Sequence, residues 1–119
     1  MNKKEENKAS NLYHHPVYKY NCAQAIIHKW TGDLSLVTEI RKYGSGRAPH
    51  GYCGALYAAL ELANSKLEHN NILLKFKAKA SSALCREIRK LNLVSCRECV
   101  DIADKLLEEN IKKSVLIKD

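Results

Sequence analysis

The segment from Tyr52 to Leu67 constrains the fold most, because it is apolar almost all round. Between positions 55 and 63, eight residues are alanine, leucine or tyrosine, and together they would cover every side of a helix. A helix that is apolar on every side is usually buried at the centre of a domain. We therefore expect a compact all-α bundle of about five to six helices around this buried central helix.

The segments around it have the three- and four-residue spacing of amphipathic helices. Apolar stripes predict helices from Leu34 to Tyr43, from Ile72 to Ala80 and from Leu84 to Leu91, and the segment from Cys22 to Trp30 is expected to pack against the central helix. The longest stripe comes last and contains Cys96, Cys99, Val100, Ala103, Leu106, Leu107 and Ile111. The charged residues that lie outside this stripe are Arg97, Glu98, Asp101, Asp104, Lys105, Glu108 and Glu109.

The length of 119 residues corresponds to one domain. Residues 1–12 are rich in polar and charged side chains, so we expect a flexible tail there and a helical domain over residues 13–119. The sequence contains neither the apolar region of a secretory leader nor a run long enough to cross a membrane. We therefore expect a cytoplasmic protein with no membrane partner.

The net charge of +7 permits acidic partners. However, the basic residues are spread along the chain, and no basic surface interleaved with aromatic residues is evident. Nucleic acid is therefore not favoured as a partner. The sequence also lacks a Ser-His-Asp pattern and a paired-carboxylate signature.

Five cysteines are the main candidates for chemistry: Cys22, Cys53, Cys85, Cys96 and Cys99. In a reducing compartment, structural disulfides are a less favoured use of so many thiols than metal, cluster or redox chemistry. Cys96 and Cys99 form one C-x-x-C pair, but the second pair typical of a zinc site is absent. The sequence has no C-x-x-C-H motif, so covalent haem attachment is not supported.

Helix-start signals accompany four of these cysteines. Asn21 with Gln24 and Ser95 with Glu98 have the spacing of capping boxes, which makes Cys22 and Cys96 the first residues of helices. Ser82 is a candidate cap for a helix whose third residue is Cys85, and Pro49 is a candidate start for the central helix, with Cys53 in its first turns. A helix N-terminus favours the thiolate, so we expect lowered cysteine pKa values.

The remaining cysteine and two other residues have less defined roles. Cys99 lies one turn inside its helix on the apolar stripe, where a cysteine commonly serves as a small core residue. The possible auxiliary residues of a thiol site are Cys99 itself, His50, three residues before Cys53, and Arg47, in the glycine-rich segment before it.

The order of these motifs resembles that of a known family. The motifs are YNCAQAI around Cys22, GYCGALYAAL at 51–60, LCREI at 84–88 and CRECVDIADKLLEE at 96–109. They are similar to those of the C-GCAxxG-C-C family, whose members are described as redox-active and are related to a domain of split-Soret cytochromes. The chain departs from the family pattern at Tyr52, where a glycine is usual, and near Ala58, where the later glycine is replaced.

The resemblance implies that Cys22, Cys53, Cys85 and Cys96 are the redox or cluster-binding residues. Four cysteines are the number that an iron–sulfur cluster requires. We therefore expect a redox-active or electron-transfer protein that either binds such a cluster or exchanges a dithiol for a disulfide with a redox partner. Two alternatives remain: a zinc-binding structural module, with the same four cysteines as metal ligands, and a basic binding protein whose cysteines fill the core.

Overall fold

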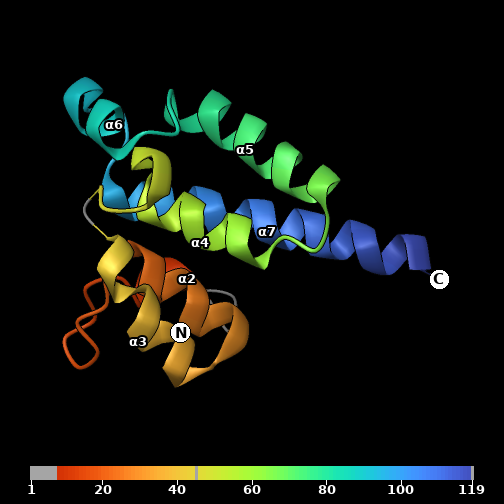
Figure 1. Cartoon of the computed structure of the whole chain (residues 1–119), viewed down its shortest axis with the longest axis horizontal. Coiled ribbons are helices and arrows are strands. Elements are labelled where there is room, and N and C mark those ends of the chain that lie inside the picture. Colours follow the sequence, from red (N-terminus) through yellow and green to blue (C-terminus); the bar gives the residue numbers. More distant parts are fainter. Residues whose placement is uncertain (1–7, 45, 119) are drawn as a thin grey trace.

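The computed structural model describes residues 8–44 and 46–118, with side chains described as far as Asn110. Within this part of the chain there are six α-helices and three short 3-10 turns, and no strand, which confirms the expected all-α bundle (Figure 1). The helices are α2 (Cys22–Thr31), α3 (Leu34–Ile40), α4 (Gly54–Leu62), α5 (Lys66–Ala80), α6 (Cys85–Leu91) and α7 (Cys96–Lys118); the turns are η1 (Ala9–Asn11), η2 (Arg41–Tyr43) and η3 (Pro49–Gly51). None of the described helices has the length and apolar composition needed to cross a membrane.

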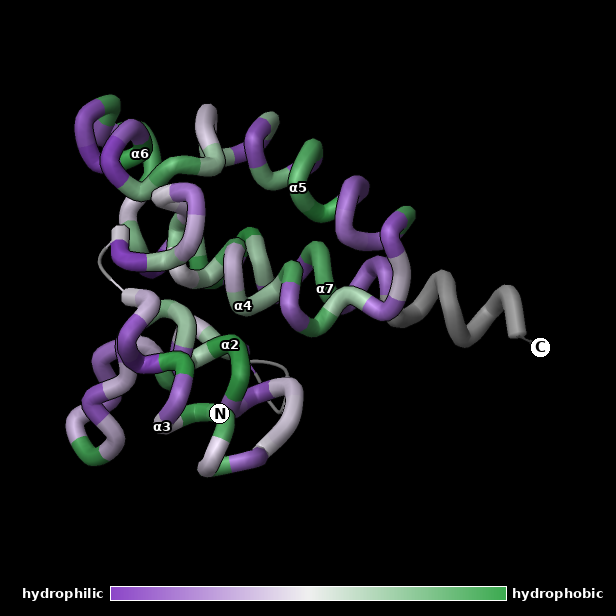
Figure 2. The backbone as a smooth tube through the Cα atoms, viewed as in Figure 1, coloured by the Kyte–Doolittle hydropathy of each residue, from purple (hydrophilic) through white to green (hydrophobic). Residues whose placement is uncertain are grey.

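Helix α4 occupies the centre of the bundle, as its sequence predicts. Figure 1 shows α7 running beside α4, with α5 on one side of the pair and α2 and α3 on the other. Six of the nine α4 residues are buried: Gly54, Ala55, Leu56, Ala58, Ala59 and Leu60. Figure 2 shows hydrophobic stretches on α2 and α4 and hydrophilic stretches on α6 at the edge of the bundle. The core therefore lies where small residues of α4 allow its neighbours to approach.

The central helix is shorter at both ends than the sequence suggests. Pro49 begins a separate 3-10 turn, and His50 adopts a left-handed conformation with a φ of 63° that interrupts the helix. Cys53 is consequently the residue before α4 rather than a residue inside it. At the other end, Ser65 begins α5 by accepting a hydrogen bond from the N–H of Glu68 at 3.1 Å. Leu67 thus belongs to α5, because this cap starts a new helix.

The two predicted capping boxes form. The Asn21 side chain accepts the N–H of Gln24 at 2.9 Å, and the Gln24 side chain accepts the N–H of Asn21 at 3.1 Å. Ser95 and Glu98 make the equivalent pair of bonds at 3.1 and 3.0 Å. These caps fix the first residues of α2 and α7, which are both cysteines.

Helix α6 begins slightly differently. Ser82 accepts the N–H of Leu84 at 3.0 Å, so this serine stabilises the turn before the helix and Cys85 is the first helical residue rather than the third.

Part of the expected N-terminal tail packs against the bundle. Residues 9–11 form η1, in which Ala9 and Ser10 are buried, while residues 1–7 lie outside the described part of the chain. The Ala9 N–H donates to the Asp104 carboxylate at 2.9 Å. The boundary expected at residue 12 is therefore too late, because a polar segment gains a buried partner that its composition does not reveal.

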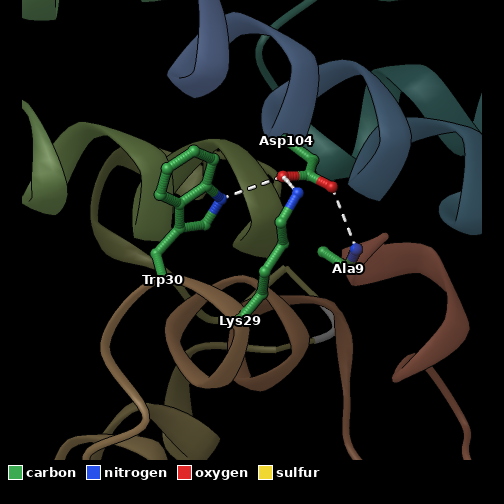
Figure 3. A network of polar contacts seen from close by, with 4 residues as sticks. All are labelled: Ala9, Lys29, Trp30 and Asp104. Carbon is green, nitrogen blue, oxygen red and sulfur yellow. Dashed lines mark hydrogen bonds and ion pairs between the residues drawn. The ribbon is translucent and has the colours of Figure 1, made fainter. Parts of the chain in front are cut away.

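Asp104 is the buried charge that joins three elements (Figure 3). Besides Ala9, its carboxylate accepts hydrogen bonds from Lys29 Nζ at 2.7 Å and Trp30 Nε1 at 2.9 Å. The sequence placed Asp104 on the solvent side of α7, but the side chain is only 6% exposed. It can be buried because both carboxylate oxygens have donors, one of which carries a positive charge.

Replacing Asp104 should therefore weaken the whole bundle. We expect Asp104→Ala to lower the free energy of unfolding by about 3 kcal/mol, because it leaves Lys29 and two N–H donors without their acceptor. Asp101→Ala, on the same helix, is the control and should cost roughly 0.5 kcal/mol. Urea titration measures both values. Equal effects of the two substitutions would contradict a special role for the Asp104 network.

Candidate functional site

All five cysteines line one small cavity of about 50 Å³. They come from the first residues of three helices, α2, α6 and α7, from the residue before α4 and, for Cys99, from one turn into α7. The structure therefore brings together the four predicted residues, Cys22, Cys53, Cys85 and Cys96. It adds Cys99, which is buried as expected for a core residue but also faces the same cavity.

Three of the thiols form the inner wall of the cavity. Cys22, Cys53 and Cys99 are 9%, 5% and 2% exposed. Cys53 lies close enough to share hydrogen bonds with Cys22 on one side and Cys99 on the other. Cys53 is thus the middle member of a chain of three buried thiols, and all five cysteines are free.

The other two thiols lie at the mouth of the cavity. Cys85 and Cys96 are only partly buried, and the exposed side chain of Arg89 lines the cavity beside them. Arg89 shares a hydrogen bond with Cys96, and the negative charges that Cys85 and Cys96 can carry raise the pKa of the guanidinium. Tyr13 also hydrogen bonds to Cys96. The mouth therefore combines reachable sulfur with a fixed positive charge.

Burial and shared protons determine the ionisation of the inner thiols. The hydrogen bond to Cys53, followed by burial, raises the pKa of Cys22 far above that of an ordinary thiol, although the N–H groups of Ala55 and Ala23 oppose this rise. For Cys53, the hydrogen bond from Cys22 lowers the pKa, but the bond to Cys99 and burial outweigh it and raise the pKa to about 12. At neutral pH both groups are therefore protonated thiols.

The expected lowering of cysteine pKa values by helix N-termini is thus wrong for Cys22, Cys53 and Cys85. A helix N-terminus stabilises a nearby anion by roughly 0.3–1 kcal/mol, which is less than one pKa unit. The rise at Cys53, from 9.0 to about 12, is several times larger. Burial also raises the pKa of Cys85, against the opposing charge of Arg89.

Gly54 allows the Cys22 sulfur to reach the cavity. A Cβ atom on Gly54 would lie 2.6 Å from Cys22 Sγ and 3.0 Å from the Tyr43 carbonyl oxygen. The first distance is shorter than real carbon contacts, and the second is tighter than most of them and involves backbone that cannot easily move. The glycine after Cys53 is therefore required for the close approach of α2 to α4.

Two of the three expected auxiliary residues, His50 and Arg47, lie outside this cavity, whereas Cys99 lines it. His50 is exposed, with its ring centroid 5.5 Å from that of Tyr52, and Arg47 is exposed on the glycine-rich loop. Arg89 and Tyr13 take the places beside the thiols instead. Arg89 follows Cys85 by four residues on one helix face, a signal present in the sequence. Tyr13 has no comparable signal, because only the fold carries it to the cavity.

The geometry also bears on the expected metal or cluster. Within the described part of the chain, no group of three or more His, Cys, Asp or Glu side chains is arranged to hold a metal ion. As arranged, the inner thiols are paired by hydrogen bonds, and the cavity admits small groups such as water or the sulfur atom of an incoming molecule.

Comparison with known proteins adds no relative. None of the protein families, curated proteins and solved structures that were compared with the chain matches it.

The two groups of thiols should react at different rates. We expect iodoacetamide at pH 8 to label Cys85 and Cys96 first and to leave Cys22, Cys53 and Cys99 largely unmodified until the protein unfolds. Raising the pH to about 10 should not release Cys53, because the reactive thiolate forms only near its pKa of about 12. Peptide mass spectrometry measures each site, with the urea-unfolded protein as control. Equal labelling of all five in the folded protein would contradict the burial order.

The packing of Gly54 predicts a steric cost. We expect Gly54→Ala to lower the free energy of unfolding by about 1–3 kcal/mol, because the new methyl group overlaps the Cys22 sulfur. Adding Cys22→Ala should recover part of this loss, since it removes the overlapping atom. A double-mutant cycle by urea titration measures the coupling between the two positions. Strict additivity would show that the two groups do not compete for space.

Proposed function

We propose that this protein is a thiol-based redox protein whose site is the cavity lined by its five cysteines. The observation that carries the proposal is the convergence of two reachable thiols and three buried, hydrogen-bonded thiols on one cavity. A core that used cysteines only as filler would have no reason to collect all of them around a solvent-reachable opening. The resemblance of the cysteine order to a redox-active family points in the same direction.

Disulfide exchange is the chemistry that this arrangement supports best. The thiolate form of Cys85 or Cys96 attacks a disulfide, which forms a mixed disulfide and releases one substrate thiolate. A second cysteine thiol then attacks the mixed disulfide as its thiolate, having lost its proton to water, and releases the other substrate thiol. The protein loses two electrons and gains one disulfide, and the substrate disulfide is reduced to two thiols.

Arg89 and Cys53 have defined parts in this proposal. Arg89 stabilises negative sulfur at the mouth, because its guanidinium shares a hydrogen bond with Cys96 and attracts the Cys85 charge. Cys53 touches two other thiols and can therefore accept a disulfide from either side. Its raised pKa keeps it protonated at neutral pH. In the expected cytoplasmic compartment, the resting state would be the fully reduced one.

A stoichiometric oxidation tests this function. We expect excess 2-hydroxyethyl disulfide, a neutral oxidant, to convert the reduced folded protein to a form with at least two fewer free thiols, and dithiothreitol to restore them. Cys85→Ser combined with Cys96→Ser should slow the reaction at least about tenfold, because the remaining thiols are buried and protonated. Thiol titration and peptide mass spectrometry provide the readouts.

Two controls make the result decisive. Arg86→Gln changes a neighbouring exposed charge on α6 and should leave the rate unchanged, whereas Arg89→Gln should lower it. Iron and zinc analysis of protein purified without oxygen tests the alternative directly. Five thiols that stay free in excess oxidant, or stoichiometric iron or zinc in the purified protein, would contradict the proposed exchange.

A further inference from the structure

A second hollow adjoins the cysteine cavity and carries an excess of positive charge. It has a volume of about 520 Å³ and is lined by three cationic side chains, Arg41, Lys42 and Arg47, and by one carboxylate, Glu39. We call the three cations the basic rim. Three positive charges and one negative charge leave an excess of two positive charges. The volume lies within the range of small-molecule sites, roughly 300–1,000 Å³.

Two residues connect this hollow to the thiols. Asn21 lines both the hollow and the cysteine cavity, and its Nδ2 donates to the Arg41 carbonyl at 2.8 Å. Gly46, on the loop that carries Arg47, packs directly on Cys85, since a Cβ atom placed on it would lie 3.8 Å from Cys85 Sγ. A ligand held at the basic rim would therefore lie beside the mouth of the cavity.

The charges of the basic rim are available to a ligand. The ion pairs within the described part of the chain join Lys29 to Asp104 and Lys75 to Glu109, and neither involves the basic rim. Lys42 Nζ lies 5.0 Å from the centroid of the Tyr43 ring, a contact that leaves its charge uncompensated. Arg41, Lys42 and Arg47 are all exposed, so an anion can reach them without rearrangement of the core.

We infer that the substrate of the cysteine site is an anionic disulfide of low molecular mass, bound through its carboxylates by the basic rim. This inference rests on the proposed disulfide exchange. A negatively charged disulfide is normally repelled by the thiolate that attacks it. Positive charge within about one Debye length, roughly 10 Å at 0.1 M salt, offsets that repulsion and concentrates the substrate at the thiols. Arg89 at the mouth adds to the same attraction.

The reaction is the one written above with this substrate as the oxidant. A mouth thiolate bonds to one sulfur of the anionic disulfide, and the sulfur–sulfur bond breaks to release an anionic thiol. Attack by a second cysteine then releases the other anionic thiol. Two electrons pass from the cysteine pair to the substrate, so no further oxidant is required.

Oxidation rates with disulfides of different charge test the inference. The probes are glutathione disulfide, which is anionic, 2-hydroxyethyl disulfide, which is neutral, and cystamine, which is cationic. We expect Lys42→Gln combined with Arg47→Gln to slow oxidation by glutathione disulfide roughly 3- to 10-fold at low salt, and to change the neutral reaction less than about twofold. The matched control, Lys77→Gln with Lys79→Gln on the exposed side of α5, removes the same charge and should change neither rate.

The outcomes separate this inference from the proposed function. The wild-type protein could react with the neutral disulfide while the basic-rim substitutions slow both reactions equally, or do not slow the anionic one. That result would overturn the anionic substrate and leave the disulfide exchange intact. Failure to react with all three disulfides would overturn both. We expect the protein with an intact basic rim to react faster with the anionic disulfide at low salt. This advantage should disappear at high salt and be absent in the basic-rim variant. Circular dichroism of each variant confirms that the fold is retained.

Discussion

The close approach of α2 to α4 is the contact on which the rest of this structure depends. It requires small side chains on α4 and the absence of one at Gly54, where the Cys22 sulfur occupies the space of a Cβ atom. The same contact places the start of α2 beside Cys53 and fixes the inner wall of the cavity. The same contact therefore forms both the core and the candidate site, because the thiols are among the most tightly packed atoms.

The N-terminal segment completes this arrangement from outside the helices. Asp104 holds Ala9, and Arg97 donates hydrogen bonds to the carbonyls of Ser10 and Tyr13. These bonds bring Tyr13 to the mouth of the cavity, where it meets Cys96. A buried carboxylate on α7 thus stabilises the bundle and also positions a residue of the candidate site.

Electrostatics divides the site into two tiers. Inside, low polarity and shared hydrogen bonds keep sulfur protonated, whereas at the mouth the Arg89 guanidinium offsets part of the effect of burial on the Cys85 thiol. The two tiers suit a site in which outer thiols react first and inner ones follow. Helix N-termini contribute to both tiers, but burial exceeds their effect wherever the thiol is enclosed.

The sequence alone determined the fold class, the buried central helix and the helix starts at Cys22 and Cys96. These follow from local rules, since apolar periodicity and capping boxes involve residues no more than a few positions apart. The same rules identified the cysteines as candidates, because four of them accompany helix-start signals. The position of Arg89 beside Cys85 could be predicted from the sequence, because Arg89 lies one helical turn after Cys85.

Only the tertiary structure decided what depends on distant contacts. The tertiary structure shows that the buried Cys99 also lines the cavity and that His50 lies outside it. It also buried Asp104 on the side of α7 that its charge assigns to solvent. The physical reason is the same in each case: burial, pKa and hydrogen-bond partners depend on what other segments bring to a residue, and no local pattern encodes that.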